Sequence, residues 1–234
     1  MYIYTCMTRS IIKIAFICLL FFGRQAPAQV YEVTFLGLPV VYVRLEKTEL
    51  NPDNHVSFQF KAETTPFFSR IFLVQNEYRL IMDSDLTGIL SFEKNIIQKN
   101  IRQNLTTRYE EKKISYSNGE WRPADGAVHN MLSLILALTK ENVPVTKHYS
   151  LEIEGEFYDA TAVPMLRDDG MIQWEIKTRK TGGRPVLKET DLFTSRLGDP
   201  AAFRSITVDQ KSQKILEANF SVSRNKLSAK IADN

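Results

Sequence analysis

One segment constrains the fold of this chain more than any other, because it is apolar on nearly every side in a sequence that otherwise alternates like β-strands. The segment runs from Ala127 to Lys140, AVHNMLSLILALTK, and its apolar side chains extend over about four turns of an α-helix. A helix this apolar must be buried. Asp125-Gly126 precedes the segment and Pro144 follows it, so the sequence predicts a buried helix over residues 127–140.

Residues 1–28 are typical of a secretory signal peptide. Arg9 and Lys13 lie at the start of an apolar run, Ile11 to Phe22, which is too short to span a bilayer comfortably. The small-residue pattern Ala26-Pro27-Ala28 follows, and predicts cleavage after Ala28, with Met7 an alternative start to Met1. We expect an exported protein, periplasmic or secreted, with one β-rich domain over residues 29–234 and no transmembrane segment after cleavage. A retained N-terminal anchor is the alternative.

Cysteine and charge content bear on the compartment and the partners. Both cysteines, Cys6 and Cys18, lie within the predicted leader, so the mature domain would depend on its hydrophobic core without disulfides. The chain has 30 Lys and Arg residues against 27 Asp and Glu residues, and removing the three basic residues of the leader leaves 27 of each sign. A neutral mature chain lacks the basic excess of nucleic-acid-binding proteins, so we expect no nucleic-acid partner.

Alternating polarity predicts β-strands along most of the remaining sequence. The clearest case is Ile101 to Tyr109, where every even position is polar or charged, and a strand from about Leu90 to Ile97 precedes it. Asn118-Gly119 predicts a hairpin turn. Proline and clustered aromatic residues in Pro66 to Leu73 predict one short helical turn, whereas Asp191 to Phe203 has little periodicity and predicts an irregular connection.

The fold class follows from these elements. About ten strands with short turns and one buried helix predict a mainly β (α+β) protein. We expect a strongly curved antiparallel sheet or an open β-barrel, wrapped around the helix at residues 127–140. The sequence has no internal repeat and no linker that would divide it into further domains.

Four stretches resemble an exported bacterial family known as domain-of-unknown-function 3108. They are Tyr31-Glu32-Val33-x-Phe35-Leu36-Gly37, Phe60-x-Ala62-Glu63-Thr64-Thr65, the hairpin around Ser91-Phe92-Glu93, and Val128-His129-Asn130-Met131-Leu132-Ser133-Leu134-Ile135-Leu136-Ala137-Leu138. Asn130 stands where that family tends to have Asp. The resemblance covers most of the mature chain and implies a secreted, mainly β domain, similar to envelope proteins of the barrel or half-barrel type, without an established activity.

The sequence contains no recognised catalytic or metal-binding pattern. His55, His129 and His148 have no His or Cys partner at ligand spacing, so we expect no metal and no cofactor. His129, at the start of the predicted helix, reads as a capping or core-edge residue rather than a general base. Ser133 lies within the helix, without the glycines of a nucleophile elbow. We therefore expect binding rather than catalysis.

Charged residues on the predicted strands read as solvent-facing. Lys94 and Lys99 belong to a basic cluster that acidic residues interrupt, which favours a solvated sheet face. Glu152, Glu154 and Glu156 alternate on one segment, which also favours an exposed face. The rival hypothesis is a hydrolase acting on envelope glycan, with Glu152 or Glu156 as acid and base. It requires two carboxylates that face each other across a polar cleft.

The aromatic residues Phe67, Phe68, Phe72 and Trp174 are the candidate ligand-binding residues. In a curved sheet they could line the mouth and receive an acyl chain or another apolar ligand. The alternative is that they belong to the core. The first functional hypothesis is thus non-enzymatic binding of a lipid-like ligand, or docking onto another envelope component.

Overall fold

A computed structural model describes residues 28–50, 54–167, 169–222 and 225–232. The predicted leader, apart from Ala28, lies outside the described residues. The described strands form one fourteen-stranded antiparallel sheet, in the order β8-β7-β6-β5-β4-β3-β2-β1-β14-β13-β12-β11-β10-β9. The first and last described strands, β1 and β14, therefore pair in the middle of the sheet, where Tyr31 lies opposite Ile231. The two edge strands, β8 and β9, are consecutive in the sequence.

The strands run as two meanders. The first contains β1 (Gln29–Phe35), β2 (Leu38–Leu50), β3 (His55–Thr64), β4 (Val74–Asp83), β5 (Ile89–Gln98), β6 (Ile101–Glu110), β7 (Lys113–Tyr116) and β8 (Trp121–Pro123). The second contains β9 (Lys147–Ile153), β10 (Glu156–Leu166), β11 (Met171–Gly183), β12 (Phe203–Asp209), β13 (Lys214–Val222) and β14 (Asn225–Ile231). The helices among the described residues are η1 (Phe68–Arg70), a short 3₁₀ turn, α2 (Met131–Leu138) and α3 (Leu192–Gly198).

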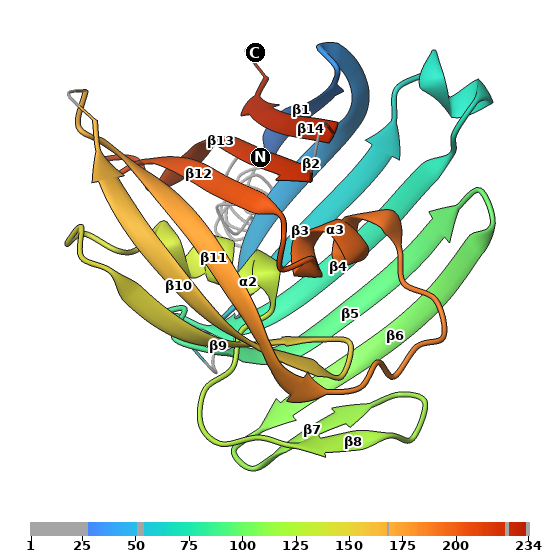
Figure 1. The fold of residues 1–234 in the computed structure, drawn as a ribbon, viewed down its shortest axis with the longest axis vertical. Coiled ribbons are helices and arrows are strands. Elements are labelled where there is room, and N and C mark those ends of the chain that lie inside the picture. Colours follow the sequence, from blue (N-terminus) through green and yellow to red (C-terminus); the bar gives the residue numbers. More distant parts are fainter. Residues whose placement is uncertain (1–27, 51–53, 168, 223–224, 233–234) are drawn as a thin grey trace, which may run out of the picture.

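The sheet curves until its two edges approach each other without pairing as a ladder (Figure 1). Residues just before α2 fill part of the gap. The backbone N–H of His129 donates to Ser150 O at 2.9 Å, and the N–H of Glu152 donates to His129 O at 2.8 Å. Ile89 N donates to Val128 O at 3.3 Å, so the same segment also contacts the start of β5. The sheet is thus an open barrel in which the chain entering α2 links β5 to β9.

Helix α2 lies inside this curved sheet and belongs to its main core. Leu134 and Leu138 are fully buried, and Leu136 is 3% exposed. Asn130 caps the helix, because its side chain accepts from Ser133 N at 2.8 Å while the Ser133 hydroxyl accepts from Asn130 N at 2.8 Å. This reciprocal arrangement is a capping box. The cap fixes the first helical residue at Met131.

The fold class expected from the sequence is confirmed: the protein is mainly β, with a curved antiparallel sheet around a buried helix. The sheet has fourteen strands rather than about ten, partly because β7 and β8 are too short to show alternation. The helix covers Met131–Leu138 rather than 127–140, because His129 pairs with β9. The short helical turn within Pro66 to Leu73 is present as η1. The expectation of an irregular connection over Asp191 to Phe203 was wrong, because α3 forms there.

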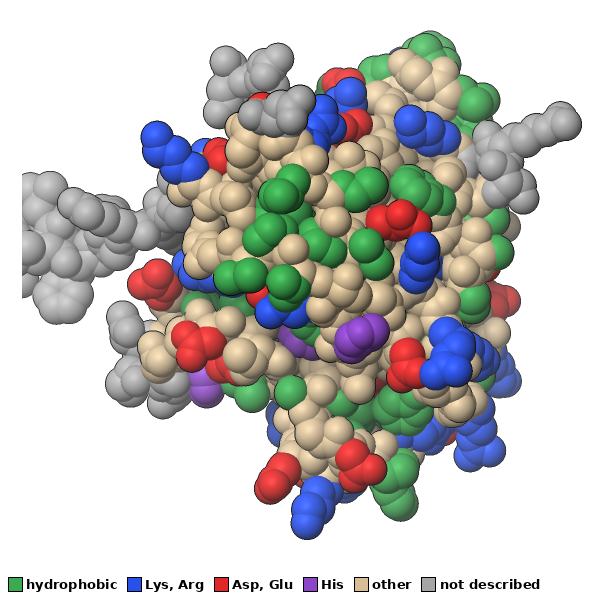
Figure 2. All heavy atoms as spheres, turned by 60° about the vertical axis from the view of Figure 1, so that its left-hand side comes forward, with side chains coloured by type: hydrophobic (Ala, Val, Ile, Leu, Met, Phe, Trp, Pro, Cys, Tyr) green, Lys and Arg blue, Asp and Glu red, His purple; other side chains and the backbone are tan. Residues whose placement is uncertain are grey.

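The outer surface carries charges of both signs. On the face that Figure 2 brings forward from the left side of Figure 1, basic and acidic side chains are interspersed around small hydrophobic patches. Within the described residues, none of the helices is long and apolar enough to cross a bilayer.

Candidate functional site

A buried ion-pair cluster lies where the two halves of the open barrel meet. Lys94 projects inward from β5 with a fully buried side chain, and its ammonium group donates to the carboxylate of Glu154. It also donates to Asp191 Oδ2 and to Gln103 Oε1, each at 3.2 Å. An ammonium group has three protons, and all three have an acceptor here. The cluster therefore joins β5 and β6 to the β9–β10 turn and to the start of α3.

Asp191 anchors α3 from the same cluster. Its Oδ1 accepts from the backbone N–H groups of Phe193 and Thr194, each at 3.0 Å, which makes Asp191 the N-cap of the helix. The Tyr78 hydroxyl, from β4, also donates to Asp191 Oδ1 at 3.0 Å. Burial, together with the nearby Asp191 carboxylate, raises the pKa of Tyr78 well above its ordinary value. Tyr78 therefore acts as a neutral donor at this site.

A second carboxylate, Glu152, connects β9 to the opposite edge of the sheet. Its Oε2 accepts from the Tyr109 hydroxyl at 2.7 Å, and its Oε1 accepts from the Tyr116 hydroxyl at 2.9 Å. The backbone N–H of Gly155 donates to the same Oε1 at 2.5 Å. Burial raises the pKa of Glu152, although these three donors act in the opposite direction. We call these six residues, Lys94, Tyr109, Tyr116, Glu152, Glu154 and Asp191, the polar seam.

The turn between β9 and β10 places Glu154 in the polar seam at a conformational cost. Glu154 has φ +51° and Gly155 has φ +92°, so both lie in the left-handed region, as a two-residue hairpin turn requires. Glycine is needed at position 155, because a Cβ atom there would lie 2.5 Å from the backbone oxygen of Arg184. Burial also raises the pKa of Glu154, and Lys94 opposes this effect.

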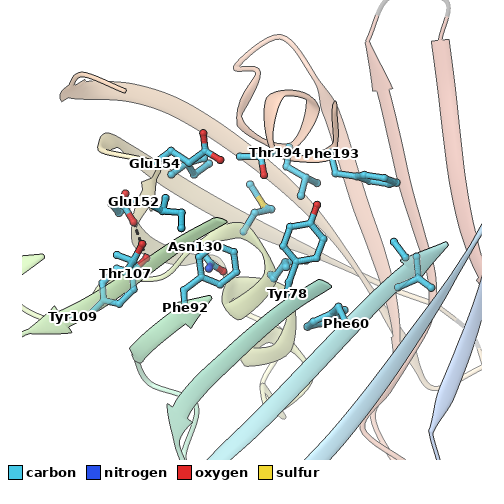
Figure 3. Close-up of a pocket in the computed structure, with 17 residues that line it drawn as sticks. Phe60, Tyr78, Phe92, Thr107, Tyr109, Asn130, Glu152, Glu154, Phe193 and Thr194 are labelled. Carbon is cyan, nitrogen blue, oxygen red and sulfur yellow. Dashed lines mark hydrogen bonds between the residues drawn. The ribbon is translucent and has the colours of Figure 1, made fainter. Parts of the chain in front are cut away.

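A cavity of about 110 Å³, the inner pocket, lies between the polar seam, the N-terminus of α2 and the start of α3 (Figure 3). Phe60, Tyr78 and Phe92 form part of its largely apolar wall, and Glu152 and Glu154 lie at one side. Asn130 also lines it. The Asn130 Oδ1 atom is used in the helix cap, whereas its buried Nδ2 atom has no partner among the described residues. The wall of the pocket thus includes a buried amide nitrogen without a hydrogen-bond partner, beneath a largely apolar surface.

A larger cavity of about 340 Å³, the mouth pocket, lies at one open end of the barrel. Its wall combines the ends of β1, β2, β4, β13 and β14 with side chains from η1 and α3, and is almost entirely apolar. Phe68 and Phe72 line it from the β3–β4 connection. Phe193, at the start of α3, lines both the mouth pocket and the inner pocket. The two cavities therefore meet at one side chain.

The structure brings two of the four candidate ligand-binding residues together. Phe68 and Phe72 both line the mouth pocket. Phe67 contacts Phe68 edge to face, with ring centroids 5.0 Å apart, but its own side chain is 73% exposed. Trp174, on β11, lies opposite Ile206 in the main core, is fully buried and lines neither pocket.

Two expectations about charged residues were wrong. Lys94 is buried rather than solvated, and Glu152 and Glu154 are 2% and 8% exposed rather than on an outer face. A signal for Lys94 was present, since it has the same parity on β5 as Phe92 and Ile96, and Ile96 is fully buried. Glu156 is separate from this cluster, because its carboxylate pairs with Lys180 and accepts from the Tyr158 hydroxyl.

These contacts bear on the hydrolase hypothesis. Both oxygens of Glu152 accept hydrogen bonds from the protein, and Glu154 pairs with Lys94, so neither carboxylate faces an open polar cleft. His129 is buried next to Tyr149, and burial lowers its pKa. Within the described part of the chain, no three His, Cys, Asp or Glu side chains lie in a group that could hold a metal ion. The arrangement is that of a structural network beside an apolar cavity.

The fold and the pockets define a class of protein: a barrel-like, mainly β domain with an apolar cavity at its open end. A solved protein with a similar fold is the β-barrel-like protein of domain of unknown function DUF1849 from Brucella abortus. The match has a TM-score of 0.54 and 9% sequence identity, and covers 88% of this chain and 95% of that one. At this identity the similarity supports the fold alone. No family model and no curated protein matches the sequence.

Proposed function

We propose that this protein is a non-enzymatic binder of ligands with an apolar chain, and that the mouth pocket is the binding site. The observation that carries the proposal is the size and lining of that pocket. Its volume of about 340 Å³ falls within the range of about 300–1,000 Å³ that is typical of small-molecule sites. An enclosure of this kind favours alkyl or acyl groups, because transfer of each methylene group from water gains about 0.8 kcal/mol.

The inner pocket extends the same proposal. Since Phe193 lines both cavities, a rotation of this side chain would let a chain in the mouth pocket reach the inner pocket. The Nδ2 atom of Asn130 is buried and has no partner among the described residues, so a small shift of this side chain would let it donate to a carbonyl or hydroxyl oxygen of the ligand. Glu152 and Glu154 line this end as well, so a neutral polar group fits better than a free carboxylate.

The cellular setting is part of the proposal. The charged, apolar and small-residue regions of residues 1–28 support export, and β1 begins at Gln29, directly after the predicted cleavage site. The four stretches that resemble the domain-of-unknown-function 3108 family support a place among exported barrel-type envelope domains. A lipid or another apolar component of the bacterial envelope is the corresponding ligand.

The test combines ligand identification with paired variants. Native mass spectrometry of the purified chain should detect co-purified lipid, and an environment-sensitive fatty-acyl dye should bind and be displaced by that lipid. Phe68→Ala with Phe72→Ala should weaken dye binding at least about tenfold, since two apolar walls are lost. Phe67→Ala is the matched control, because the same ring is removed outside the pocket, and we expect a change below about threefold.

Two outcomes would refute this proposal. One is a wild-type protein that carries no lipid and binds no apolar dye. The other is equal weakening by the Phe67→Ala control, which would show that the dye reports on the exposed aromatic surface rather than on the mouth pocket.

A further inference from the structure

Besides Phe72, which lines the mouth pocket, five exposed apolar side chains lie around its entrance, at the β1–β2 turn and on the β3–β4 connection. Leu36 lies in the β1–β2 turn, Leu38 is the first residue of β2, and Phe67, Ile71 and Leu73 lie in the β3–β4 connection. Their exposed fractions are 72%, 58%, 73%, 65% and 36%, in that order. We call this set the apolar rim. Figure 1 shows both connections at the upper right of the molecule, projecting beyond the strands.

Hydrogen bonds hold the β3–β4 connection to the start of β2, directly after the β1–β2 turn. Thr65 N donates to Val40 O at 3.0 Å, and the Thr65 hydroxyl donates to Pro39 O at 3.2 Å. The rim is also continuous with the mouth pocket. Phe68 and Phe72 line the pocket from the same connection that exposes Phe67 and Ile71. A hydrophobic path thus leads from the surface into the cavity.

Leu36 is exposed despite an unfavourable backbone conformation. Its φ is +51° and that of Gly37 is +81°, and a two-residue turn of this kind prefers Asn-Gly. A leucine in the left-handed region costs roughly 1 kcal/mol relative to the right-handed one. With 72% of its surface exposed, Leu36 gains little from the core in return. An apolar side chain that serves neither the turn nor the core points to a binding role.

Exposed basic residues outnumber acids on the connections around the rim, where Glu63, near the end of β3, is the exposed acid next to the β3–β4 connection. Arg70 is exposed and is the only charged residue among residues 35–40 and 65–73. The adjacent β5–β6 turn adds Lys99 and Arg102, both exposed, and no acid lies among residues 98–102. This turn is next to the β3–β4 connection, since Val74 pairs with Gln98. Basic residues beside apolar side chains are suited to a surface of anionic lipid headgroups.

We propose that the apolar rim docks on the surface of a lipid bilayer that contains anionic lipid. The rim consists of separate side chains on two narrow connections, which a fluid lipid surface accommodates more readily than a rigid protein face. Its exposed area is on the order of 600 Å², below the roughly 800 Å² that each partner contributes to a standard protein interface. Docking would place the mouth pocket against the bilayer, and it does not depend on whether the pocket holds a ligand.

The experiment measures the partitioning of the purified chain onto vesicles of phosphatidylcholine with one quarter phosphatidylglycerol, and onto vesicles of phosphatidylcholine alone. We expect measurable binding to the first and at least about fivefold weaker binding to the second. Leu36→Asn combined with Phe67→Ser should reduce partitioning at least about tenfold. Asn suits the turn conformation at position 36, so this variant should keep its stability in urea denaturation.

The matched control removes two side chains of similar exposure elsewhere. Leu166, at the end of β10, is 71% exposed and lies at the opposite end of the barrel, and Trp121, on β8, is 58% exposed. Leu166→Ser with Trp121→Ser should change partitioning by less than about twofold. Equal losses in both variants, or no vesicle binding by the wild-type chain, would overturn the proposal. Self-association of the wild-type chain that the rim variant abolishes would assign the rim to a second copy instead.

Failure of docking is distinguishable from failure of the ligand-binding proposal. The rim variant keeps Phe68 and Phe72, so it should bind the fatty-acyl dye in solution as the wild-type chain does. Conversely, Phe68→Ala with Phe72→Ala should lose dye binding and still partition onto vesicles.

Discussion

Replacing Lys94 with methionine should lower the free energy of unfolding by about 3–5 kcal/mol, the usual cost of removing one partner from a buried ion pair. Methionine has a similar length, so the change chiefly removes the charge. The side chains of Lys94 and Asp191 are 0% exposed and that of Glu154 is 7% exposed. The substitution leaves both carboxylates without their cation in a site that water does not reach, and Gln103 loses a donor.

The matched control is Lys180→Met, which breaks a Lys–Glu pair at the surface. Lys180 pairs with Glu156, and its side chain is 45% exposed, so solvent screens the pair and the expected cost is below about 1 kcal/mol. Urea unfolding at pH 7.5, followed by tryptophan fluorescence, measures both variants because Trp174 is fully buried. If the two variants lose the same free energy of unfolding within about 0.5 kcal/mol, Lys94 does not compensate the buried carboxylates of the polar seam, and the reasoning is refuted.

Lowering the pH should reduce the loss of stability that Lys94→Met causes. Burial raises the pKa of Glu154 and Lys94 lowers it, so without Lys94 this pKa rises further in the folded state. As the pH falls through that raised value, the folded variant takes up a proton and its deficit relative to wild type shrinks. Adding Glu154→Gln should restore at least about 1 kcal/mol at pH 7.5. A deficit that grows as the pH falls would contradict this electrostatic account.

Two further predictions concern Glu152 and the buried helix. Burial raises the pKa of Glu152 in the folded state above its ordinary value of 4.5. Ionisation of Glu152 therefore does not affect the free energy of unfolding below pH 4.5, and it lowers that free energy as the pH rises from 4.5 through the raised pKa. Glu152→Gln should therefore flatten the dependence of unfolding free energy on pH above about 5, as a series of urea titrations would measure. Leu134→Ala should cost about 2–5 kcal/mol by the same assay, because Leu134 is fully buried, whereas Leu166→Ala, at a residue 71% exposed, should cost less than about 0.5 kcal/mol.

The sequence predicted the sheet and the buried helix because both leave local patterns. In β6, Leu105 and Thr107 are buried while Asn104 and Arg108 are exposed, as the alternation required. The near-continuous apolar surface of α2 could be satisfied only in a core. Its exact start could not be predicted, since the backbone of His129 pairs with β9 and this contact joins residues distant in sequence. The capping residue Asn130 is, by contrast, of a type that favours helix starts.

The polar seam was missed for a different reason. Alternating polarity predicts which residues share a face of a strand. It does not predict that the two edges of the sheet will approach each other. On an isolated meander, Glu152 and Glu154 would face water. They become buried only because β9 approaches the inner side of β5 to β7, where Lys94, Tyr109 and Tyr116 provide their partners. The sequence suggested one apolar site at the mouth of the sheet, and of the four residues proposed for it Phe68 and Phe72 line the mouth pocket. The inner pocket was not predicted.

The topology explains why ionisable residues gather at one line of the barrel. Because β1 pairs with β14, the free edges of the sheet belong to β8 and β9, which flank the excursion of the chain through α2. Exposed edges invite pairing with other chains. Here β8 is short and ends in Pro123, while the middle of β9 is covered by the chain that enters α2. Side chains close the rest of the gap between the two edges. Because these side chains are buried, they hold the edges together through strong hydrogen bonds between charged and polar groups. Glu152 and Glu154 therefore line the inner pocket as a consequence of how the barrel closes, which accounts for acidic groups beside an apolar cavity.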